Sequence, residues 1–408
     1  MHSDSLFHVD LSAIAQNASM FARLVGPEAV CCGVVKADAY GLGARPVAET
    51  LRGAGMPLVA VFRVEEALDL LSLPERGQIL VLGVVRSLCP MHPLVPGLAD
   101  GCVELVVHDK HQLREIAVLA AGQSIAIRVH VKVDTGMGRG GCGPHEAAEL
   151  IQLVLQTPGV ALAGVMTHFT SAGTNADATT EQAALFTRIL NGVQLPAGCR
   201  VHLAATAATV RDRVYHHGMV RIGLGLVGCI PGSESLANAW AGQLIPAVRW
   251  VSALSHVRSI QAGQPVGYGQ TWRASQDTTI GIIPIGYADG IPRQAGSSQT
   301  DTGASIAILQ PDGKTVAGHV PVIGLVSMDQ IAVDLGGIDG GSDIEPGRAI
   351  EVLSATQEGP SSLRGFAAAC GLSPHQVLVG INPRVRRVHA RVQEVASSHE
   401  SWQSATAG

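Results

Sequence analysis

The chain has 408 residues, of which 47% are hydrophobic and 15% are charged, and its formal net charge is −5. This composition excludes a disordered chain and a protein that coats nucleic acid, and the length predicts two or three globular domains. The chain contains only four lysines and only four tyrosines, so each of these residues can be examined separately for a functional role.

No apolar run reaches the roughly 20 residues that a membrane-spanning helix needs, so no membrane partner is expected. The first ten residues, MHSDSLFHVD, hold acids and histidines where a signal peptide has basic and apolar residues, which predicts a cytoplasmic protein. The eight cysteines are scattered without a CxxC pair, so free thiols are expected and a metal site is not. No block of lysine and arginine indicates a nucleic-acid partner.

Short β-branched runs alternate with stretches of helical spacing in the first part of the chain. The runs predict eight strands, at Val30–Lys36, Leu58–Phe62, Ile79–Val85, Val103–His108, Ile125–Val133, Val160–Thr167, Arg200–Ala204 and Met219–Leu224. The helical stretches are Ala44–Arg52, Val64–Leu73, Lys110–Ala121, Pro144–Gln156, Thr179–Leu190 and Ala207–Val214. Continuous apolar strands between helices are typical of a parallel sheet covered on both faces. Eight such units favour a (β/α)8 TIM-type barrel over an open doubly wound sheet, which is the alternative.

From residue 242 onward, helical spacing nearly disappears and strand-like runs are separated by Gly, Pro, Asp and Ser. Strands are predicted at Val248–Arg258, Thr279–Ile285, Ser305–Ile308, Thr315–Val326, Ile331–Leu335, Ala349–Val352 and Val385–Val392. One helix is predicted at Ser361–Ala369 with Gly371 as its C-cap, and the Ser/Ala-rich end at 396–408 is expected to fray. The predicted fold class is therefore α/β, with a barrel over residues 1–241 and a mostly antiparallel β domain over residues 242–408.

Polar, glycine-rich segments follow the predicted first, fifth and sixth barrel strands, where the active site of such a barrel lies. In the first segment, VVKADAYGLG, an apolar strand ends at Lys36, which places this side chain at the barrel mouth. Burial lowers the pKa of a lysine, and the neutral amine can form a Schiff base or accept a proton. The alternative is a lysine at a strand end that reaches back to water.

The other two segments add three candidates. Lys132 is followed by Asp134 and Arg139, so it is either a site residue or one arm of a salt bridge at the rim. Arg139 can bind a carboxylate through two parallel hydrogen bonds. His168 is either an acid–base group or an orienting hydrogen-bond partner.

Two further segments end the barrel pattern. Thr206 can cap a helix whose free N–H groups suit a phosphate, although a cap without a ligand is an equal alternative. Arg221, in VRIGLG, points into an apolar barrel and needs a partner, for which a cofactor is one candidate. In the β domain, GYGQTW and IGYADGIPR hold Tyr268 and Tyr287, and structural aromatics at turns are the alternative there.

Six motifs in this order, VVKADAYG, KVDTGMGR, VRIG, GYGQTW, IGYADGIPR and SMDQ, resemble the alanine racemase family of fold-type III pyridoxal-phosphate enzymes. The resemblance covers nearly the whole chain and implies the barrel. It implies an isomerase that converts L-alanine to D-alanine, a peptidoglycan precursor, with pyridoxal 5'-phosphate as cofactor. It also implies a homodimer with shared active sites.

The resemblance implies roles for single residues. Lys36 would bind the cofactor covalently and serve as one catalytic base, while Tyr268 would be the second base, on the opposite face and from the partner subunit. Arg221 would donate a hydrogen bond to the pyridine nitrogen, with His168 in the same network. The cofactor phosphate would be held by Tyr40, Thr206, Gly223 and Leu224. The substrate carboxylate would be held by Arg139 and the backbone of Met328, and Lys132 matches a lysine that many members carry as a carbamate.

Several positions depart from the family's usual pattern. They are Val227 for tyrosine, Ala205 for asparagine, Leu325 for arginine, Ser327 for cysteine and Pro383 for a tyrosine that binds phosphate in some members. The changes at Leu325 and Pro383 would alter the substrate entrance, so a serine or broad-range racemase is an alternative. A non-catalytic pyridoxal-phosphate carrier and a fold-type III decarboxylase are two others, and a second domain that carries GYGQTW argues against both.

Overall fold

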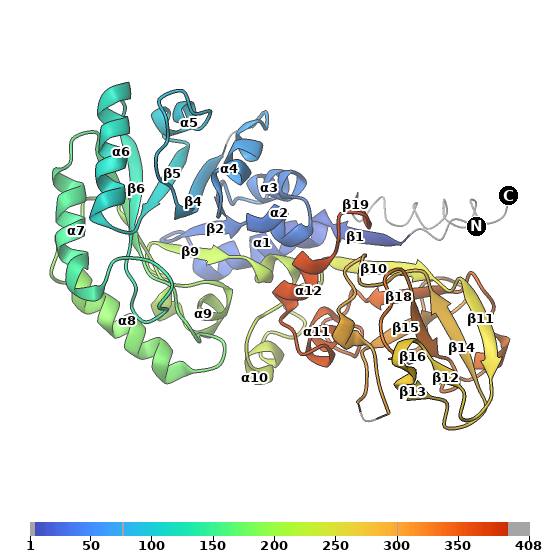
Figure 1. Ribbon diagram of the computed structural model, residues 1–408. Helices are drawn as coiled ribbons and strands as arrows, with labels where there is room; N and C mark the ends of the chain where they lie inside the picture. Colours follow the sequence, from blue (N-terminus) through green and yellow to red (C-terminus); the bar gives the residue numbers. More distant parts are fainter. Residues whose placement is uncertain (1–4, 76, 300, 391–408) are drawn as a thin grey trace.

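The structure is a computed structural model that describes residues 5–75, 77–299 and 301–390. Figure 1 shows two bodies, a barrel surrounded by helices and a β-rich domain beside it. The predicted end of the last strand, at Arg391 and Val392, and the predicted frayed end at 396–408 lie outside the described residues. Every helix in the described ranges is too short or too polar to cross a lipid bilayer.

The first body contains a parallel sheet with the strand order β8-β7-β6-β5-β4-β3-β2-β9. Its strands are β2 (Val30–Val34), β3 (Leu58–Val61), β4 (Gln78–Val84), β5 (Val103–Val107), β6 (Ile127–Lys132), β7 (Val160–Met166), β8 (Arg200–His202) and β9 (Met219–Ile222). The two outer strands of this order meet, because Gly218 N donates to Val201 O (3.1 Å) and Arg221 N to Ala204 O (3.0 Å). The predicted eight-stranded barrel is confirmed.

Helices cover the outside of the barrel (Figure 1). They are α1 (Leu11–Val25), α3 (Ala44–Gly53), α4 (Val64–Leu71), α5 (Val95–Ala99), α6 (Lys110–Gln123), α7 (Pro144–Gln156), α8 (Ala176–Leu190) and α9 (Thr206–Arg211). The six predicted helices are present, whereas α1 and α5 were not predicted. Helix α1 begins where the Asp10 carboxylate accepts hydrogen bonds from Ser12 N (2.8 Å) and Ala13 N (3.0 Å). It buries an apolar face that includes Ile14 and Phe21.

The second body contains a sheet with the order β11-β14-β17-β16-β15-β18-β10-β1-β19. Its strands are β1 (Leu6–Asp10), β10 (Val248–Ala253), β11 (His256–Ile260), β14 (Thr278–Ile283), β15 (Ser305–Leu309), β16 (Val316–Ile323), β17 (Ile331–Asp334), β18 (Ala349–Leu353) and β19 (Arg386–Ala390), and a hairpin adds β12 (Pro265–Val266) and β13 (Trp272–Arg273). Only the β1–β19 pair is parallel among the described strands of this sheet, so the mostly antiparallel prediction is confirmed. The predicted strand Val248–Arg258 is in fact two strands, β10 and β11, that pair with different neighbours.

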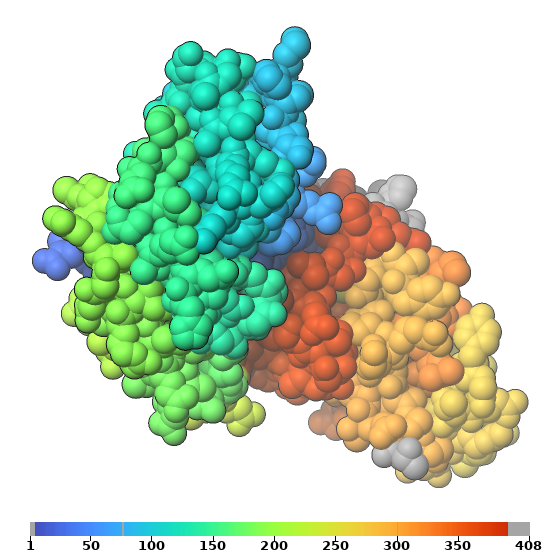
Figure 2. All heavy atoms as spheres, turned by 60° about the vertical axis from the view of Figure 1, so that its left-hand side comes forward, coloured from blue at the N-terminus to red at the C-terminus, as the bar shows by residue number. Residues whose placement is uncertain are grey.

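Three helices accompany the second body, namely α10 (Glu234–Asn238), α11 (Leu363–Ala369) and α12 (Pro374–Gly380). Helix α11 matches the predicted one, and Gly371 after it has the positive φ (+64°) expected of a C-terminal glycine. Helix α12 was not predicted. In Figure 2 the red segment that contains α11 and α12 lies between the barrel and the β-rich domain.

The first strand of the chain, β1, lies in the second sheet, although its residues fall in the range 1–241. It pairs with β10 on one side and with β19 on the other. Its alternate residues Phe7 and Val9 are fully buried and join a hydrophobic cluster that includes residues of both bodies. The barrel mouth and the second body are therefore packed against one core.

Candidate active site

Lys36 lies at the barrel mouth, directly after the carboxyl end of β2. It begins the short helix α2 (Lys36–Gly41) and is half-buried. Burial and the positive charge of Arg139 lower the pKa of the Lys36 amine, Glu66 opposes that shift, and Arg221 adds to it. A larger fraction of the amine is therefore neutral, which is the form that attacks a carbonyl or accepts a proton.

Residues 37–40, directly after Lys36, form a left-handed turn without a glycine. Their φ angles lie between 52° and 60°. This conformation costs a residue with a Cβ roughly 1–2 kcal/mol, so four in succession need support from their surroundings. Ala37 N donates to Glu66 Oε1 (2.5 Å), and Asp38 Oδ1 accepts from Ala44 N (2.6 Å). Contacts with α3 and α4 thus hold the turn that carries Lys36 and Tyr40.

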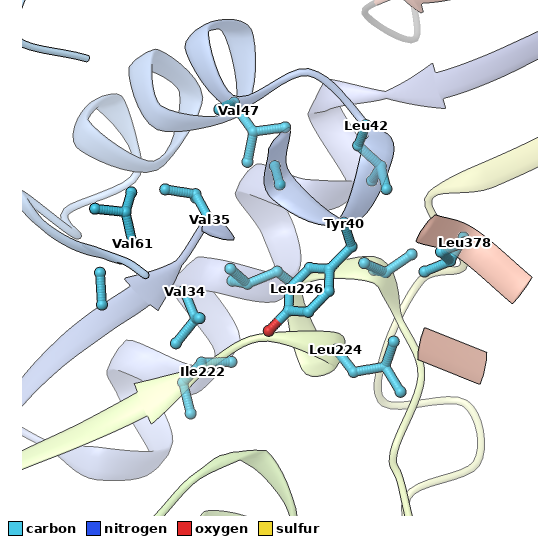
Figure 3. Packing of buried hydrophobic residues seen from close by; sticks show 14 of the residues in the cluster. Val34, Val35, Tyr40, Leu42, Val47, Val61, Ile222, Leu224, Leu226 and Leu378 are labelled. Carbon is cyan, nitrogen blue, oxygen red and sulfur yellow. The ribbon is translucent and has the colours of Figure 1, made fainter. Parts of the chain in front are cut away.

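Tyr40 points from this turn toward the segment after β9. Figure 3 shows its hydroxyl directed at the chain between Ile222 and Leu224. A Cβ atom placed on Gly223 would lie only 2.2 Å from the Tyr40 oxygen, so the glycine makes this approach possible. Burial raises the pKa of Tyr40, which keeps the phenol protonated and able to donate. The ring packs edge-on against His375 of α12, with centroids 5.6 Å apart.

Thr206, the first residue of α9, lies on the other side of the same segment. Its Oγ1 accepts hydrogen bonds from Gly223 N (3.1 Å) and Gly225 N (3.3 Å). These two contacts use the lone pairs of the oxygen and leave its proton free to donate. The hydroxyls of Tyr40 and Thr206 therefore converge on Gly223, as an anion-binding site requires.

Arg221 is buried in the barrel and is held by its two terminal nitrogens. Nη1 donates to His202 Nδ1 (2.7 Å) and to the His202 carbonyl (3.1 Å). Nη2 donates to the carbonyls of Thr167 (2.9 Å) and Leu203 (3.1 Å) and to His168 Nδ1 (3.1 Å). The remaining donor, Nε–H, has no acceptor among the described residues. Burial lowers the pKa of Arg221 to about 10, so the group is still a cation at neutral pH.

The positively charged side chains of the mouth perturb one another. Burial and then the charge of Arg139 lower the pKa of Lys132. Burial and then Arg221 lower the pKa of His168 to about 3, so this imidazole is neutral. Arg139 itself is exposed, and its guanidinium makes no hydrogen bond to the described residues. The barrel mouth therefore contains several positively charged side chains, as expected of a site that binds anionic groups.

The loop that carries Arg139 is shaped by one carboxylate. Asp134 accepts hydrogen bonds from the N–H groups of Gly136 (2.9 Å), Gly138 (3.0 Å) and Arg139 (3.1 Å). The motif KVDTGMGR therefore encodes a compact turn that presents the arginine. No group of His, Cys, Asp or Glu side chains in the described ranges is arranged to hold a metal ion.

The structure does not bring Tyr268 to the mouth of its own barrel. The residue lies between β12 and β13, at the part of the β-rich domain remote from α2 in Figure 1. Its side chain is 71% exposed, and Met328 is 54% exposed. Tyr287 and Leu325 are exposed as well, and backbone contacts join the segments of all four residues. We call Tyr268, Tyr287, Leu325 and Met328 the apolar patch.

The positions that depart from the family pattern have different surroundings. Val227 is buried in the hydrophobic core, Ala205 is half-buried before α9, and Ser327 is half-buried beside the apolar patch. Pro383 and Leu325 are exposed. Only Leu325 belongs to the patch itself.

Sequence reasoning missed three buried polar residues beneath Arg221, namely Glu104, His130 and His202. The signal was present in β6, where Arg128, His130 and Lys132 alternate with valines. Alternate residues of a strand share one face, so this pattern places polar groups inside the barrel.

Comparisons with known proteins agree with this arrangement. The family model described as alanine racemase, N-terminal domain, matches residues 9–231, and the alanine racemase C-terminal domain matches residues 247–389. An alanine racemase of Treponema pallidum subsp. pallidum is 35% identical over 381 residues, which are 88% of this chain and 93% of the relative. The chain belongs to the alanine racemase family.

Solved structures of alanine racemases show the same fold. The enzyme from D-cycloserine-producing Streptomyces lavendulae superposes with a TM-score of 0.82 at 27% identity and covers 96% of this chain and 98% of its own. The alanine racemase of Bartonella henselae, solved with covalently bound pyridoxal phosphate, gives a TM-score of 0.81 at 25% identity over 95% of this chain and 100% of its own. The match to the alanine racemase family therefore includes both bodies.

Proposed function

We propose that this chain is a pyridoxal-phosphate-dependent alanine racemase that interconverts L- and D-alanine. The observation that carries the proposal is Arg221, a buried cation whose Nε–H has no acceptor in the described part of the chain. A pyridine nitrogen placed there would accept this hydrogen bond, and the amine of Lys36 lies at the same mouth. When bound, the cofactor withdraws electrons from the α-carbon of the substrate amine and makes its hydrogen acidic.

The residues around Gly223 fit the phosphate of this cofactor. The hydroxyls of Tyr40 and Thr206 converge there, and the backbone at Gly223 and Leu224 supplies the remaining surface. Lys36 would hold the cofactor covalently through its neutral amine. Arg221 keeps its own proton at neutral pH, so it would leave the ring nitrogen of the cofactor unprotonated and would limit side reactions.

Inversion at the α-carbon needs a proton acceptor on one face and a donor on the other. Lys36 Nζ serves one face, and Tyr268 Oη of the partner subunit serves the other. Arg139 and the backbone N–H of Met328 hold the substrate carboxylate, and Lys132 stands beside Arg139 to orient it. If Lys132 carries a carbamate, its charge changes from positive to negative and it pairs with Arg139 directly.

We infer a homodimer with shared active sites, because Tyr268 and the apolar patch are exposed and remote from Lys36 of their own chain. An exposed patch of aromatic and long apolar side chains is typical of an interface. Mixing the Lys36→Ala and Tyr268→Ala chains tests this. A hybrid dimer has one intact site, so about a quarter of the wild-type activity should return after random reassociation. No recovery, with hybrid dimers present in the mixture, contradicts sharing.

Borohydride reduction of the protein loaded with pyridoxal phosphate tests the function itself. Peptide mass spectrometry should find the reduced cofactor on Lys36, and chiral chromatography should show D-alanine formed from L-alanine. A chain that binds the cofactor but racemises no amino acid would instead be a carrier. Carbon dioxide release from basic amino acids would identify a decarboxylase.

A serine or broad-range racemase is the second candidate, because Leu325 places an apolar side chain in the patch where many family members have an arginine. A screen of α-deuterium exchange over the standard amino acids separates the two, since an alanine enzyme exchanges alanine far faster than larger substrates. All eight cysteines are unpaired thiols, which supports a reducing compartment such as the cytoplasm. There the product D-alanine would enter peptidoglycan synthesis.

A further inference from the structure

The interior of the barrel beneath Arg221 is polar. Glu104 of β5, His130 of β6 and His202 of β8 are all fully buried. Barrel interiors are usually filled by branched apolar side chains, and a buried carboxylate or imidazole must be hydrogen-bonded. None of these three residues takes part in the steps proposed above, so their presence needs a separate explanation.

These residues form one continuous hydrogen-bonded chain below Arg221. Nη1 of Arg221 lies 2.7 Å from His202 Nδ1, and His202 Nε2 lies 2.8 Å from His130 Nδ1. His130 Nε2 then lies 2.9 Å from Glu104 Oε2. We call Glu104, His130 and His202 the barrel relay.

The two ends of the relay fix the direction of every bond in it. A guanidinium only donates and a carboxylate only accepts. His202 Nδ1 must therefore accept from Arg221, which leaves the proton of a neutral His202 on Nε2. That proton is donated to His130 Nδ1, so His130 also carries its proton on Nε2 and donates it to Glu104. Burial lowers the pKa of both imidazoles, which keeps both neutral.

The lower end of the relay is anchored by two arginines. Glu104 accepts hydrogen bonds from Arg128 Nε (2.7 Å) and from Arg200. Burial alone would raise the pKa of the Glu104 carboxyl, but the hydrogen bond from His130 and the two arginines bring it to about 2. Glu104 is thus a permanent acceptor.

A glycine makes room for the middle of the relay. A Cβ atom on Gly164 would lie 2.3 Å from His130 Nδ1 and 2.6 Å from the carbonyl oxygen of Arg200. Any side chain at this position would displace the His130 ring from His202. Gly164 is therefore needed for two reasons, the position of the His130 ring and the close approach of the Arg200 carbonyl of β8.

We propose that Glu104, His130 and His202 are positioning residues that hold the guanidinium of Arg221 from below, so that its Nε–H faces the cofactor. The guanidinium is planar, so fixing Nη1 on His202 also fixes the direction of the Nε–H bond. The proposal rests on the proposed function for the identity of the ligand at Nε. The direction of the hydrogen bonds does not depend on it.

Neutron diffraction from the perdeuterated enzyme loaded with pyridoxal phosphate tests the direction. We expect deuterons on Nε2 of both His130 and His202 and none on their Nδ1 atoms. A deuteron on either Nδ1 overturns the proposal, whether or not the protein racemises alanine. If the deuterons are as expected and no racemisation occurs, the proposed function fails and the relay stands.

Glu104→Gln tests whether the direction matters to the cofactor. Oε1 accepts from both Arg128 and Arg200, so in the variant the amide oxygen takes that position and the NH2 group takes the position of Oε2. There the NH2 group loses the hydrogen bond from Arg200, and it faces His130 Nε2 and donates to it. This reverses both tautomers and places a His202 N–H against Arg221, which is also a donor. We expect the dissociation constant of pyridoxal phosphate to rise roughly ten- to a hundredfold, the effect of one charge-assisted hydrogen bond, with a shifted visible absorption of the bound cofactor.

Arg128→Gln is the matched control, because it removes one partner of Glu104 but leaves its carboxylate and both tautomers intact. Its cofactor affinity and spectrum should match the wild type. Gly164→Ala is a second disrupting variant that changes no polar group, and it should weaken cofactor binding in the same way. Wild-type affinity and spectrum in both folded disrupting variants would refute the relay, as would an equal loss in the control.

Discussion

The contact between Tyr40 and Gly223 gives a quantitative test of how the phosphate end of the site is built. In Gly223→Ala the new Cβ would lie 2.2 Å from Tyr40 Oη, whereas an ordinary contact starts at 3.4 Å. The tyrosine ring has little room to retreat, because it is buried among leucines and against His375 (Figure 3). The substitution therefore forces the ring or the segment after β9 to move.

The size of the effect follows from the neighbouring atoms. Overpacking of a buried site costs about 1–3 kcal/mol, and an overlap of about 1 Å with a buried ring lies in the upper half of that range. In Tyr40→Phe the clashing oxygen is gone and the nearest ring atom would be Cζ at 3.1 Å, which needs only a small adjustment. The double variant should therefore regain about 1–2 kcal/mol relative to the sum of the single variants.

Urea unfolding of the four cofactor-free proteins measures this coupling, and titration with pyridoxal phosphate measures affinity. We expect the double variant to recover stability but not cofactor affinity. It still lacks the Tyr40 hydroxyl, which would donate a hydrogen bond to the phosphate. Each variant should bind the cofactor about tenfold more weakly than the wild type. Additive losses of unfolding free energy would show that Tyr40 does not contact Gly223 as described. An unchanged affinity for pyridoxal phosphate in Tyr40→Phe would show that this hydroxyl does not bind the phosphate.

Four further outcomes are expected. Tyr268→Ala should leave cofactor binding intact and nearly stop racemisation, with α-proton exchange of one enantiomer reduced more than that of the other in deuterium oxide. Arg139→Gln should raise the KM for alanine about ten- to a hundredfold at unchanged cofactor affinity, as steady-state kinetics would show. The folded pKa of His168, about 3, lies below its ordinary 6.5, so this residue alone should cost up to about 1.4 kcal/mol of stability per pH unit below pH 6.5. Other buried histidines contribute in the same direction, so urea unfolding of His168→Asn should show a shallower pH slope than the wild type, by about this amount. Ala37→Val should lower the unfolding free energy by about 1–2 kcal/mol, whereas Ala37→Gly should not lower it, because only glycine relaxes at positive φ.

The barrel was predictable because several of its strands, such as β3, β4 and β7, are nearly continuous apolar runs, which are typical of a sheet covered on both faces. Strand β1 was missed because its five residues, LFHVD, precede any repeat of the pattern and pair with strands some 240 and 380 positions later in the chain. Pairing across such distances leaves no local signal. Helix α12 was missed because its seven residues, PHQVLVG, show no helical period and contain two valines and a glycine. The equally short α11 was predictable from its alanines and from Gly371 after it.

The site was predictable where motif and strand end coincide. Lys36 was placed at the mouth by the apolar strand before it, and the structure brings it near Arg139 and Arg221. The barrel relay was not predicted, because its members come from three strands and each looks like an isolated histidine or acid in the sequence. His216 shows the same limit, since nothing in the adjacent sequence indicates that it is buried and hydrogen-bonded to the carbonyl of Thr209 (2.9 Å).

The cofactor end of the barrel is shaped from two opposite directions. From below, the relay fixes the plane of Arg221 through side chains that never reach the mouth. From the second body, α12 closes over the left-handed turn, because His375 lies against the Tyr40 ring and a Cβ on Gly41 would lie 3.1 Å from the Leu378 carbonyl oxygen. A turn with four strained residues persists only while such neighbours hold it. The geometry of Lys36 and Tyr40 is therefore a property of both bodies together, and the pairing of β1 with β10 and β19 ties the segment before the barrel to the sheet that carries α12.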